Sequence, residues 1–341
     1  MSNPDQSPLR GLLVTGGAGY IGSHTTRMLV ERKIAEKVIV LDDLSEGYKQ
    51  AIVSPEVELV EGNVADREVV RSIFEKNSID AVIHFAAFIQ VGESVKDPLK
   101  YYRNNTAAPL TLLEVMQDAG CAKFILSSTA AVYGEPESMP IDETHTKHPI
   151  NPYGASKSFL EDILADCDTA FGLKSVCLRF FNASGSSPDG LIGEAHQPET
   201  HLIPRILMAI NGETDSFSVF GTDYETPDGT CVRDFIHVLD LARAHIKALK
   251  YLVGGGESLR CNLGTGTGFS VKEMIEAAEK VTGKTVPVKY GERRGGDAPT
   301  LVANPELAER VLGWKAEHTD VYDIVESAWR WFGAEHRGKY S

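Results

Sequence analysis

Long hydrophobic runs, basic residues and cysteine are all scarce in this 341-residue sequence, and each shortage excludes a class of protein. The longest apolar run, near residues 81–89, contains His84 and is far shorter than the ~20 residues that a membrane-spanning helix needs. Lysine and arginine number 34 against 48 acidic residues, which gives a formal net charge of −14. We therefore expect neither nucleic acid nor a membrane as the partner of so acidic a chain.

The five cysteines are odd in number and scattered, and no two have CxxC spacing. This pattern predicts reduced thiols and a cytoplasmic protein. Residues 1–9 are polar and lack the apolar segment of a secretory signal, so we expect a short disordered lead-in there. His145 and His148 stand three apart but lie beside Pro149, with no cysteine or HExxH partner, so we expect no metal site.

What the sequence does contain, over its first 180 residues, is an alternation of β-rich runs and helical periodicity. The β-rich runs cover residues 11–15, 37–41, 57–60, 81–85, 123–127 and 175–180. The helical stretches cover residues 23–33, 66–76, 98–119 and 152–170. Continuous apolar strands separated by helices predict an α/β fold with a doubly wound parallel sheet, covered on both faces.

The residue composition changes after Asn182. Glycine, proline and aspartate cluster in residues 184–198 and 221–229, which is typical of loops around a smaller α/β lobe. Helical periodicity returns at residues 202–211, 238–252, 271–281 and 319–332. We place the boundary near residue 183 and expect a first domain over 10–183 and a second lobe over 184–335. Residues 235–262 could return to the first domain.

A glycine pattern follows the first predicted strand. Gly16, Gly19 and Gly22 form G-x-x-G-x-x-G between an apolar strand and a helical run. Glycine there permits a tight turn and a close approach of backbone to a pyrophosphate, which then faces the free N–H groups of the helix. Asp42 ends the second predicted strand, 20 residues after Gly22. A carboxylate at that place accepts from ribose hydroxyls and repels a 2′-phosphate, so the pattern favours NAD over NADP.

A second pattern indicates a residue pair suited to proton transfer. Tyr153 and Lys157 are four apart in a predicted helix, so both lie on one face. A lysine ammonium beside the phenol is expected to lower the tyrosine pKa and make it a base near neutral pH. The strand over 123–127 leads into Thr129 at the sheet edge where ligands of such folds bind, and its hydroxyl could hydrogen-bond the reacting oxygen.

These motifs together resemble the UDP-glucose (UDP-galactose) 4-epimerases, within the extended short-chain dehydrogenase/reductase superfamily. The resemblance covers residues 11–332. It is carried by residues 15–23 (TGGAGYIGS), 84–86, 91–95 (VGESV), 104–105, 127–134 (SSTAAVYG), 153–157 (YGASK), 179–182 (RFFN), 222–238, 262–266 (NLGTG) and 293–297 (RRGGD).

The resemblance implies a Rossmann-type NAD-binding domain and a UDP-sugar-binding lobe. It implies that Tyr153 is the base, that Lys157 supports it and holds the nicotinamide ribose, and that Thr129 completes the triad. With Tyr153 and Lys157, the residues implied to bind NAD are Gly16, Gly19, Tyr20, Ile21, Gly22, Asp42, Asp43, Asn63, Val64, Phe85, Ala86, Ala87, Asn104 and Phe181. With Thr129 and Tyr153, the residues implied to bind the UDP-sugar are Asn182, His201, Leu202, Ser218, Phe220, Arg233, Arg294, Asp297 and Leu301.

The implied reaction inverts C4 of UDP-galactose or UDP-glucose. Bound NAD accepts hydride from C4 while Tyr153 takes the O4 proton. The transient 4-keto sugar then rotates about its link to UDP, and hydride returns to the opposite face of C4. The implied assembly is a homodimer built on helices near residues 98–119 and 152–170.

Several residues depart from the pattern of this family. Asn63 replaces an aspartate that faces adenine, Ile89 a lysine, Phe180 a tyrosine, and His201 an asparagine that reaches the sugar phosphates. Leu301 stands where the family has either a bulky tyrosine or a small residue. The smaller leucine predicts that 2-acetamido sugars such as UDP-GlcNAc also fit, and pentose substrates such as UDP-xylose and UDP-arabinose stay open.

Two other functions compete with this one. A nucleotide-sugar 4,6-dehydratase of the related family carries an Asp-Glu pair after the catalytic threonine, where this chain has Ala130 and Ala131. A non-catalytic NAD-binding regulator would not need the Thr129, Tyr153 and Lys157 set.

Overall fold

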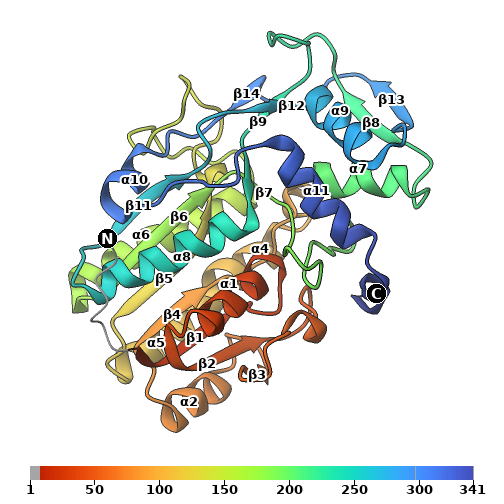
Figure 1. The fold of residues 1–341 in the computed structure, drawn as a ribbon. Coiled ribbons are helices and arrows are strands. Elements are labelled where there is room, and N and C mark those ends of the chain that lie inside the picture. The colour runs from red at the N-terminus through yellow and green to blue at the C-terminus, as the bar shows by residue number, and fades with distance from the viewer. Residues whose placement is uncertain (1–7, 296, 341) are drawn as a thin grey trace.

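The computed structural model describes residues 8–295 and 297–340, and its centre is a seven-stranded parallel sheet (Figure 1). The strand order is β11-β6-β5-β4-β1-β2-β3. The strands are β1 (Leu9–Thr15), β2 (Ala35–Asp42), β3 (Glu58–Glu61), β4 (Ala81–His84), β5 (Lys123–Thr129), β6 (Lys174–Phe180) and β11 (Leu259–Leu263). Every pairing in this sheet is parallel. The predicted fold class is confirmed.

Helices cover both faces of the sheet because its central strands are apolar on both sides. Leu12 and Val14 of β1 belong to the core on one face, whereas Leu13 belongs to the core on the other. The first face is covered by α1 (Tyr20–Glu31) and α8 (Val238–Val253), which pack side by side. The second face is covered by α2 (Arg67–Lys76), α5 (Ala108–Asp118) and α6 (Pro152–Phe171). None of the helices in the described part of the chain is long and apolar enough to cross a membrane.

The second lobe is built from shorter elements around a third core (Figure 1). Its helices are α7 (Leu202–Ile210), α9 (Val271–Thr282) and α11 (Val321–Phe332). Helix α10 (Glu306–Leu312) instead packs against α8 and β11 and belongs to the core on the first face of the large sheet. Its strands form three small sheets: β7 (Asn182–Ser184) with β10 (Phe235–His237), β8 (Phe217–Phe220) with β13 (Val288–Gly291), and β12 (Phe269–Ser270), β9 (Val232–Arg233) and β14 (Thr300–Leu301). Strand β11 lies far along the chain yet pairs with β6 in the large sheet.

The structure differs from the predicted elements at a few places. The first strand begins at Leu9, inside the expected lead-in, of which residues 1–7 lie outside the described residues. The helix predicted over 98–119 is divided into α4 (Pro98–Tyr102), a π-helical turn (Arg103–Ala107) and α5. Helices α3 (Val91–Lys96) and α10 were not predicted, because six and seven residues are too few to establish a helical period.

Candidate active site

A cavity of about 910 Å³ runs along the carboxyl ends of the parallel strands. Its walls are the segments that follow β1, β2, β3, β4, β5 and β6, together with parts of the second lobe. This is the edge at which open α/β sheets bind ligands. Two ends of the cavity have different chemistry: the glycine loop and acidic strand ends lie at one, and the hydroxyl, phenol and ammonium groups at the other.

The glycine loop closes so tightly that side chains would not fit. Gly16 has φ +72°, and a Cβ there would lie 2.4 Å from the backbone nitrogen of Ala86. A Cβ on Gly22 would lie 2.1 Å from the carbonyl oxygen of Gly16. Gly19 caps α1 without a side chain, so the first N–H groups of the helix face the cavity unobstructed. This loop therefore fits a pyrophosphate group.

The ends of β2 and β3 supply the polar groups of the predicted adenosine site. Asp42 is buried, and its two carboxylate oxygens accept the N–H groups of Ala18 and Leu44, each at 2.9 Å. Burial raises the pKa of Asp42, and those two hydrogen bonds oppose the rise. Asn63 donates its Nδ2–H to the carboxylate of Asp43 at 2.7 Å. The Oδ1 atom of Asn63 accepts the backbone N–H of Ala65 at 2.9 Å. These carboxylate oxygens keep lone pairs that can accept ribose hydroxyls.

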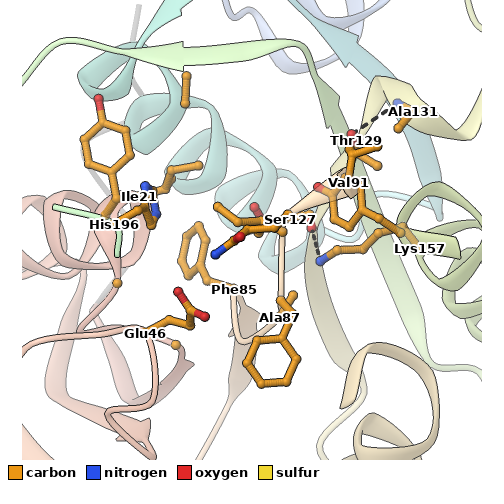
Figure 2. A pocket seen from close by; sticks show the side chains of 18 of the residues that line it. Ile21, Glu46, Phe85, Ala87, Val91, Ser127, Thr129, Ala131, Lys157 and His196 are labelled. Atoms are coloured by element: carbon orange, nitrogen blue, oxygen red, sulfur yellow. Dashed lines mark hydrogen bonds between the residues drawn. The ribbon is translucent and has the colours of Figure 1, made fainter. Parts of the chain in front are cut away.

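The proposed triad comes together from two elements. Thr129 is the last residue of β5, and Tyr153 and Lys157 lie one turn apart at the start of α6, all three lining the cavity (Figure 2). Pro152 opens the helix, and the side chain of Asn151 caps it by accepting the N–H of Gly154 at 2.9 Å. The Lys157 ammonium donates to the carbonyl of Ser127 at 2.9 Å. The end of β5 and the start of α6 thus set the geometry of these three groups.

The electrostatics of Tyr153 differ from the sequence-based expectation. Burial raises the pKa of Tyr153, and the hydrogen bond with Thr129 only partly opposes it. Burial also lowers the pKa of Lys157 to about 8, although the nearby carboxylate of Glu161 opposes this shift. The net shift of the Tyr153 pKa is therefore upward, the opposite of the predicted direction. Both groups are desolvated, and the ammonium points to Ser127.

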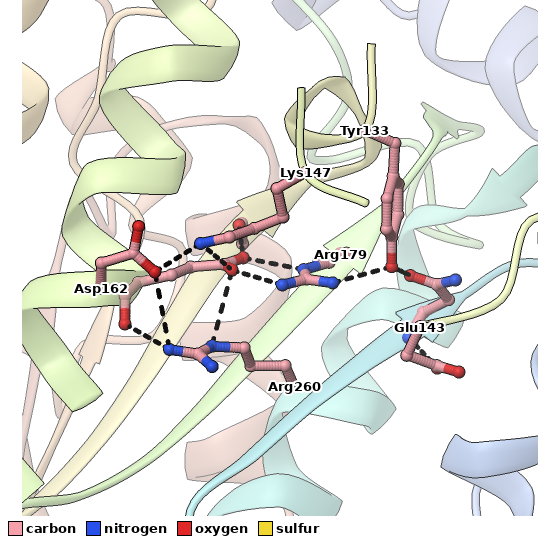
Figure 3. Close-up of polar contacts among 9 residues, drawn as sticks. Tyr133, Glu143, Lys147, Asp162, Arg179 and Arg260 are labelled. Atoms are coloured by element: carbon pink, nitrogen blue, oxygen red, sulfur yellow. Dashed lines mark hydrogen bonds and ion pairs between the residues drawn. The ribbon is translucent and has the colours of Figure 1, made fainter. Parts of the chain in front are cut away.

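A buried ion-pair network holds α6 against the sheet (Figure 3). Glu161 lies one turn beyond Lys157 and receives both Nε and Nη2 of Arg179, from β6, at 3.0 and 2.6 Å. Ser128 of β5 donates to the same carboxylate at 2.6 Å, and Tyr133 accepts the third arginine contact at 2.8 Å. The helix that carries the proposed base is thereby fastened to the strand that carries Thr129.

The structure brings most of the predicted site residues together. Every residue predicted for NAD lines the cavity, and so do Asn182, His201, Arg233, Arg294 and Leu301 of the predicted UDP-sugar set. The other four predicted residues do not line it: Leu202, Ser218, Phe220 and Asp297. Phe220 and Asp297 reach it indirectly, because Arg294 stacks 5.0 Å from the Phe220 ring and binds Asp297 at 2.8 Å.

Several cavity residues were missed by the sequence analysis. Glu46 lies on the side of Ile21 and His196 and Val91 lies beside Thr129 and Lys157 (Figure 2), and Glu194, His196 and Arg205 come from the second lobe. The two histidines at 196 and 201 are five apart in the sequence, with a glutamate two residues before each. That spacing is the one local signal that could have drawn attention to them.

Comparison with known proteins agrees with this geometry. The family model described as GDP-mannose 4,6 dehydratase matches residues 13–327. The UDP-glucose 4-epimerase of Streptococcus mutans is 50% identical over 328 residues, which are 96% of this chain and 98% of the relative. The UDP-glucose 4-epimerase of Brucella ovis in complex with NAD superposes with TM-score 0.91 at 46% identity, covering 94% of this chain and 98% of that one.

A further solved structure extends the agreement. The UDP-glucose 4-epimerase of Bifidobacterium longum, in complex with NAD+ and UDP, has TM-score 0.89 and 39% identity, and the match covers 96% of this chain and 99% of that one. The identities of 39–50% extend over nearly the full length of this chain and of its relatives. The chain belongs to the UDP-glucose 4-epimerase family.

Proposed function

We propose that this protein is an NAD-dependent epimerase that inverts C4 of UDP-galactose and UDP-glucose through a transient 4-keto sugar. The observation that carries the proposal is one cavity with a pyrophosphate-fitting glycine loop at one end and Thr129, Tyr153 and Lys157 at the other. NAD, when bound, supplies the acceptor and donor of the C4 hydride. The glycine loop, Asp42 and Lys157 are the groups that would hold it.

The chain's own contribution to the chemistry is proton transfer and orientation. Tyr153 would remove the O4 proton as hydride leaves C4, and Thr129 would hydrogen-bond the same oxygen. After the 4-keto sugar has turned, hydride would return to the opposite face of C4 and Tyr153 would return a proton to O4. Because burial raises the pKa of Tyr153, a neighbouring positive charge must favour its phenolate, and the buried Lys157 ammonium is the cation the chain provides there.

Inversion also requires a tightly held nucleotide and a sugar that can turn. Arg233 and Arg294 line the cavity on the second-lobe side, and guanidinium groups suit a pyrophosphate. Both are tethered to Asp297, at 3.7 and 2.8 Å, which orients them before the ligand arrives. Phe181 and Leu301 also line the cavity, and their apolar side chains offer the sugar no hydrogen bonds.

The test is Tyr153→Phe against the matched control Tyr290→Phe, whose ring is 72% exposed and far along the chain. We expect Tyr153→Phe to lose a factor of about 10²–10⁴ in turnover of UDP-galactose while keeping its NAD, because it removes a general base and little volume. Retention of near-normal turnover would refute the assignment of Tyr153. Loss of turnover in Tyr290→Phe as well would show damage unrelated to the site.

The dehydratase alternative lacks its proton-transfer group. Ala130 and Ala131 line the cavity directly after Thr129, so no carboxyl group from this segment can remove water across C5–C6. Mass spectrometry of the reaction products tests the point. An epimerase gives a product of unchanged mass, whereas a product lighter by one water would overturn the assignment.

The shape of the sugar end favours a wider substrate range. Leu301 lines the cavity and packs on the small cluster of Val132, Tyr133 and Ile141. This packing restricts the rotation of the Leu301 side chain. We propose that UDP-GlcNAc and UDP-GalNAc are also substrates. Leu301→Tyr should abolish their turnover and preserve that of UDP-galactose, and equal loss for both sugars would contradict this.

We also propose a cytoplasmic homodimer. Large apolar side chains are exposed on the outer surface of α3, α4, α5 and α6, including Val95 (63%), Leu99 (68%) and Phe159 (51%). Adjacent exposed apolar side chains of this kind are typical of a subunit interface. The free cysteines fit a reducing compartment. Light scattering tests the dimer, and Phe159→Glu should shift it toward monomer.

A further inference from the structure

Four ligand-type side chains meet in the segment between β7 and α7, at the edge of the cavity. They are Glu194, His196, Glu199 and His201, and one potential ligand atom from each lies within 4.8 Å of all the others. Of the four, only His201 belongs to the residues that the family resemblance implies for UDP-sugar binding, and the mechanism proposed above uses none of them. The glutamate side chains are 5% and 6% exposed, so two carboxylates are almost fully removed from water here.

The four separations between a histidine nitrogen and a glutamate oxygen are close to those of a tetrahedral site. The Nδ1 atom of His201 lies 2.7 Å from Glu194 and 3.2 Å from Glu199, and Nδ1 of His196 lies 3.2 and 3.8 Å from the same two carboxylates. Zinc bonds of about 2.0–2.1 Å to nitrogen and oxygen place tetrahedral ligands about 3.3 Å apart. Both rings present the same nitrogen to the centre of the group.

The charge of the cluster calls for a cation. Among the described side chains, neither carboxylate forms an ion pair with lysine or arginine; their recorded ion pairs are with the two histidines. Balancing both carboxylates with protons on the rings would put two imidazolium ions 5.2 Å apart. One divalent ion balances them with both rings neutral.

We propose that Glu194, His196, Glu199 and His201 bind one divalent transition-metal ion, with zinc the best match. Two imidazoles and two carboxylates in a tetrahedral arrangement suit zinc, whereas magnesium and calcium prefer more numerous oxygen ligands. All four ligands come from the chain, so the site is structural and has no open position for catalysis.

The ion would fix one wall of the cavity. Figure 2 shows His196 at the end that also carries Ile21, and its ring meets Tyr20 edge-on at 6.2 Å. His201 directly precedes α7, so a metal bond at Nδ1 would anchor the start of that helix. The remaining N–H, at Nε2, would then be free to donate to a phosphate in the cavity. That last consequence rests on the proposed function, whereas metal binding itself does not.

The experiment measures metal in the NAD-loaded enzyme, purified without a histidine tag. We expect about one zinc per chain by mass spectrometry after dialysis. After chelation, added cobalt should give the visible absorption of a tetrahedral site, and zinc should raise the melting temperature. His196→Gln and Glu199→Gln should lose the metal on the same dialysis, while the exposed His148→Gln should keep it.

The outcomes separate clearly. Wild-type protein that stays folded and holds no zinc or cobalt after reloading would overturn the proposal and leave protonated histidines as the partners of the two glutamates. Equal metal content in wild type and His196→Gln would also overturn it, because the metal would then sit elsewhere. Because the cobalt spectrum is measured on wild type, a variant that fails to fold does not remove the test. Turnover of UDP-galactose is measured separately, so a failed metal site and a failed epimerase assignment can be told apart.

Discussion

Replacing Arg179 by methionine tests whether the buried network under α6 holds the catalytic helix in place. Arg179 is 3% exposed and Glu161 is fully buried, and the two share a bidentate ion pair (Figure 3). Methionine keeps most of the stem volume but leaves the Glu161 carboxylate with Ser128 and with two cations at 3.7 and 3.9 Å. Removing one partner of a buried pair costs about 3–5 kcal/mol, because the other charge stays buried and poorly compensated.

The expected change is large enough to measure in two ways. Urea denaturation should show the free energy of unfolding reduced by about 3–5 kcal/mol. At about 2.1 cal/mol/K of unfolding entropy per residue, 341 residues give about 0.7 kcal/mol/K, so Tm should fall by about 4–7 °C. As a control, Arg67→Met breaks a contact with the exposed Glu114 and Asp118 and should cost less than about 1 kcal/mol.

A double variant decides the cause. Glu161→Met with Arg179→Met removes both charges, so no unpaired charge remains buried, and it should recover at least part of the stability lost in Arg179→Met. A loss in Arg179→Met no larger than in the Arg67 control would refute the reasoning. So would a double variant whose loss equals the sum of the two single losses, since the charges would then act independently.

Three further predictions concern the cofactor loop, the site lysine and the buried histidines. Gly16→Ala should lose bound NAD, measured by absorbance, whereas Gly120→Ala, which has a similar φ of +69° but open space around it, should keep it. Because the pKa of Lys157 is about 8, turnover should decline as pH rises through 8, and a profile of Lys157→Met with the same alkaline decline would contradict this. Burial lowers the pKa of His84 to about 3 and of His245 to about 4, so the unfolded state binds more protons below pH 6.5 and stability should fall on acidification. The loss from pH 7 to 5.5 is about 1.2 kcal/mol per histidine, and urea midpoints of His245→Met should show a correspondingly smaller loss.

Much of the fold was predictable because the signals are local and repeated. The strand runs of the first half are apolar on both faces, and the helices between them follow a 3.6-residue period, so the parallel sheet followed from the pattern. The short helices α3 and α10 were not predictable, because six and seven residues are too few to establish a helical period. The pairing of β11 with β6 is also non-local, and the sequence predicted only that residues 235–262 could return to the first domain, not this neighbour or register.

The sequence by itself determined the glycine loop, Asp42 and the placing of Tyr153 and Lys157 on one helix face, since each depends on spacing within a single turn or helix. The tertiary structure alone decided the rest. It raised the pKa of Tyr153 and turned Lys157 toward Ser127, because desolvation depends on what packs around a group. It also gathered two glutamates and two histidines at the cavity edge, since the separation of side-chain atoms depends on how the backbone turns between them.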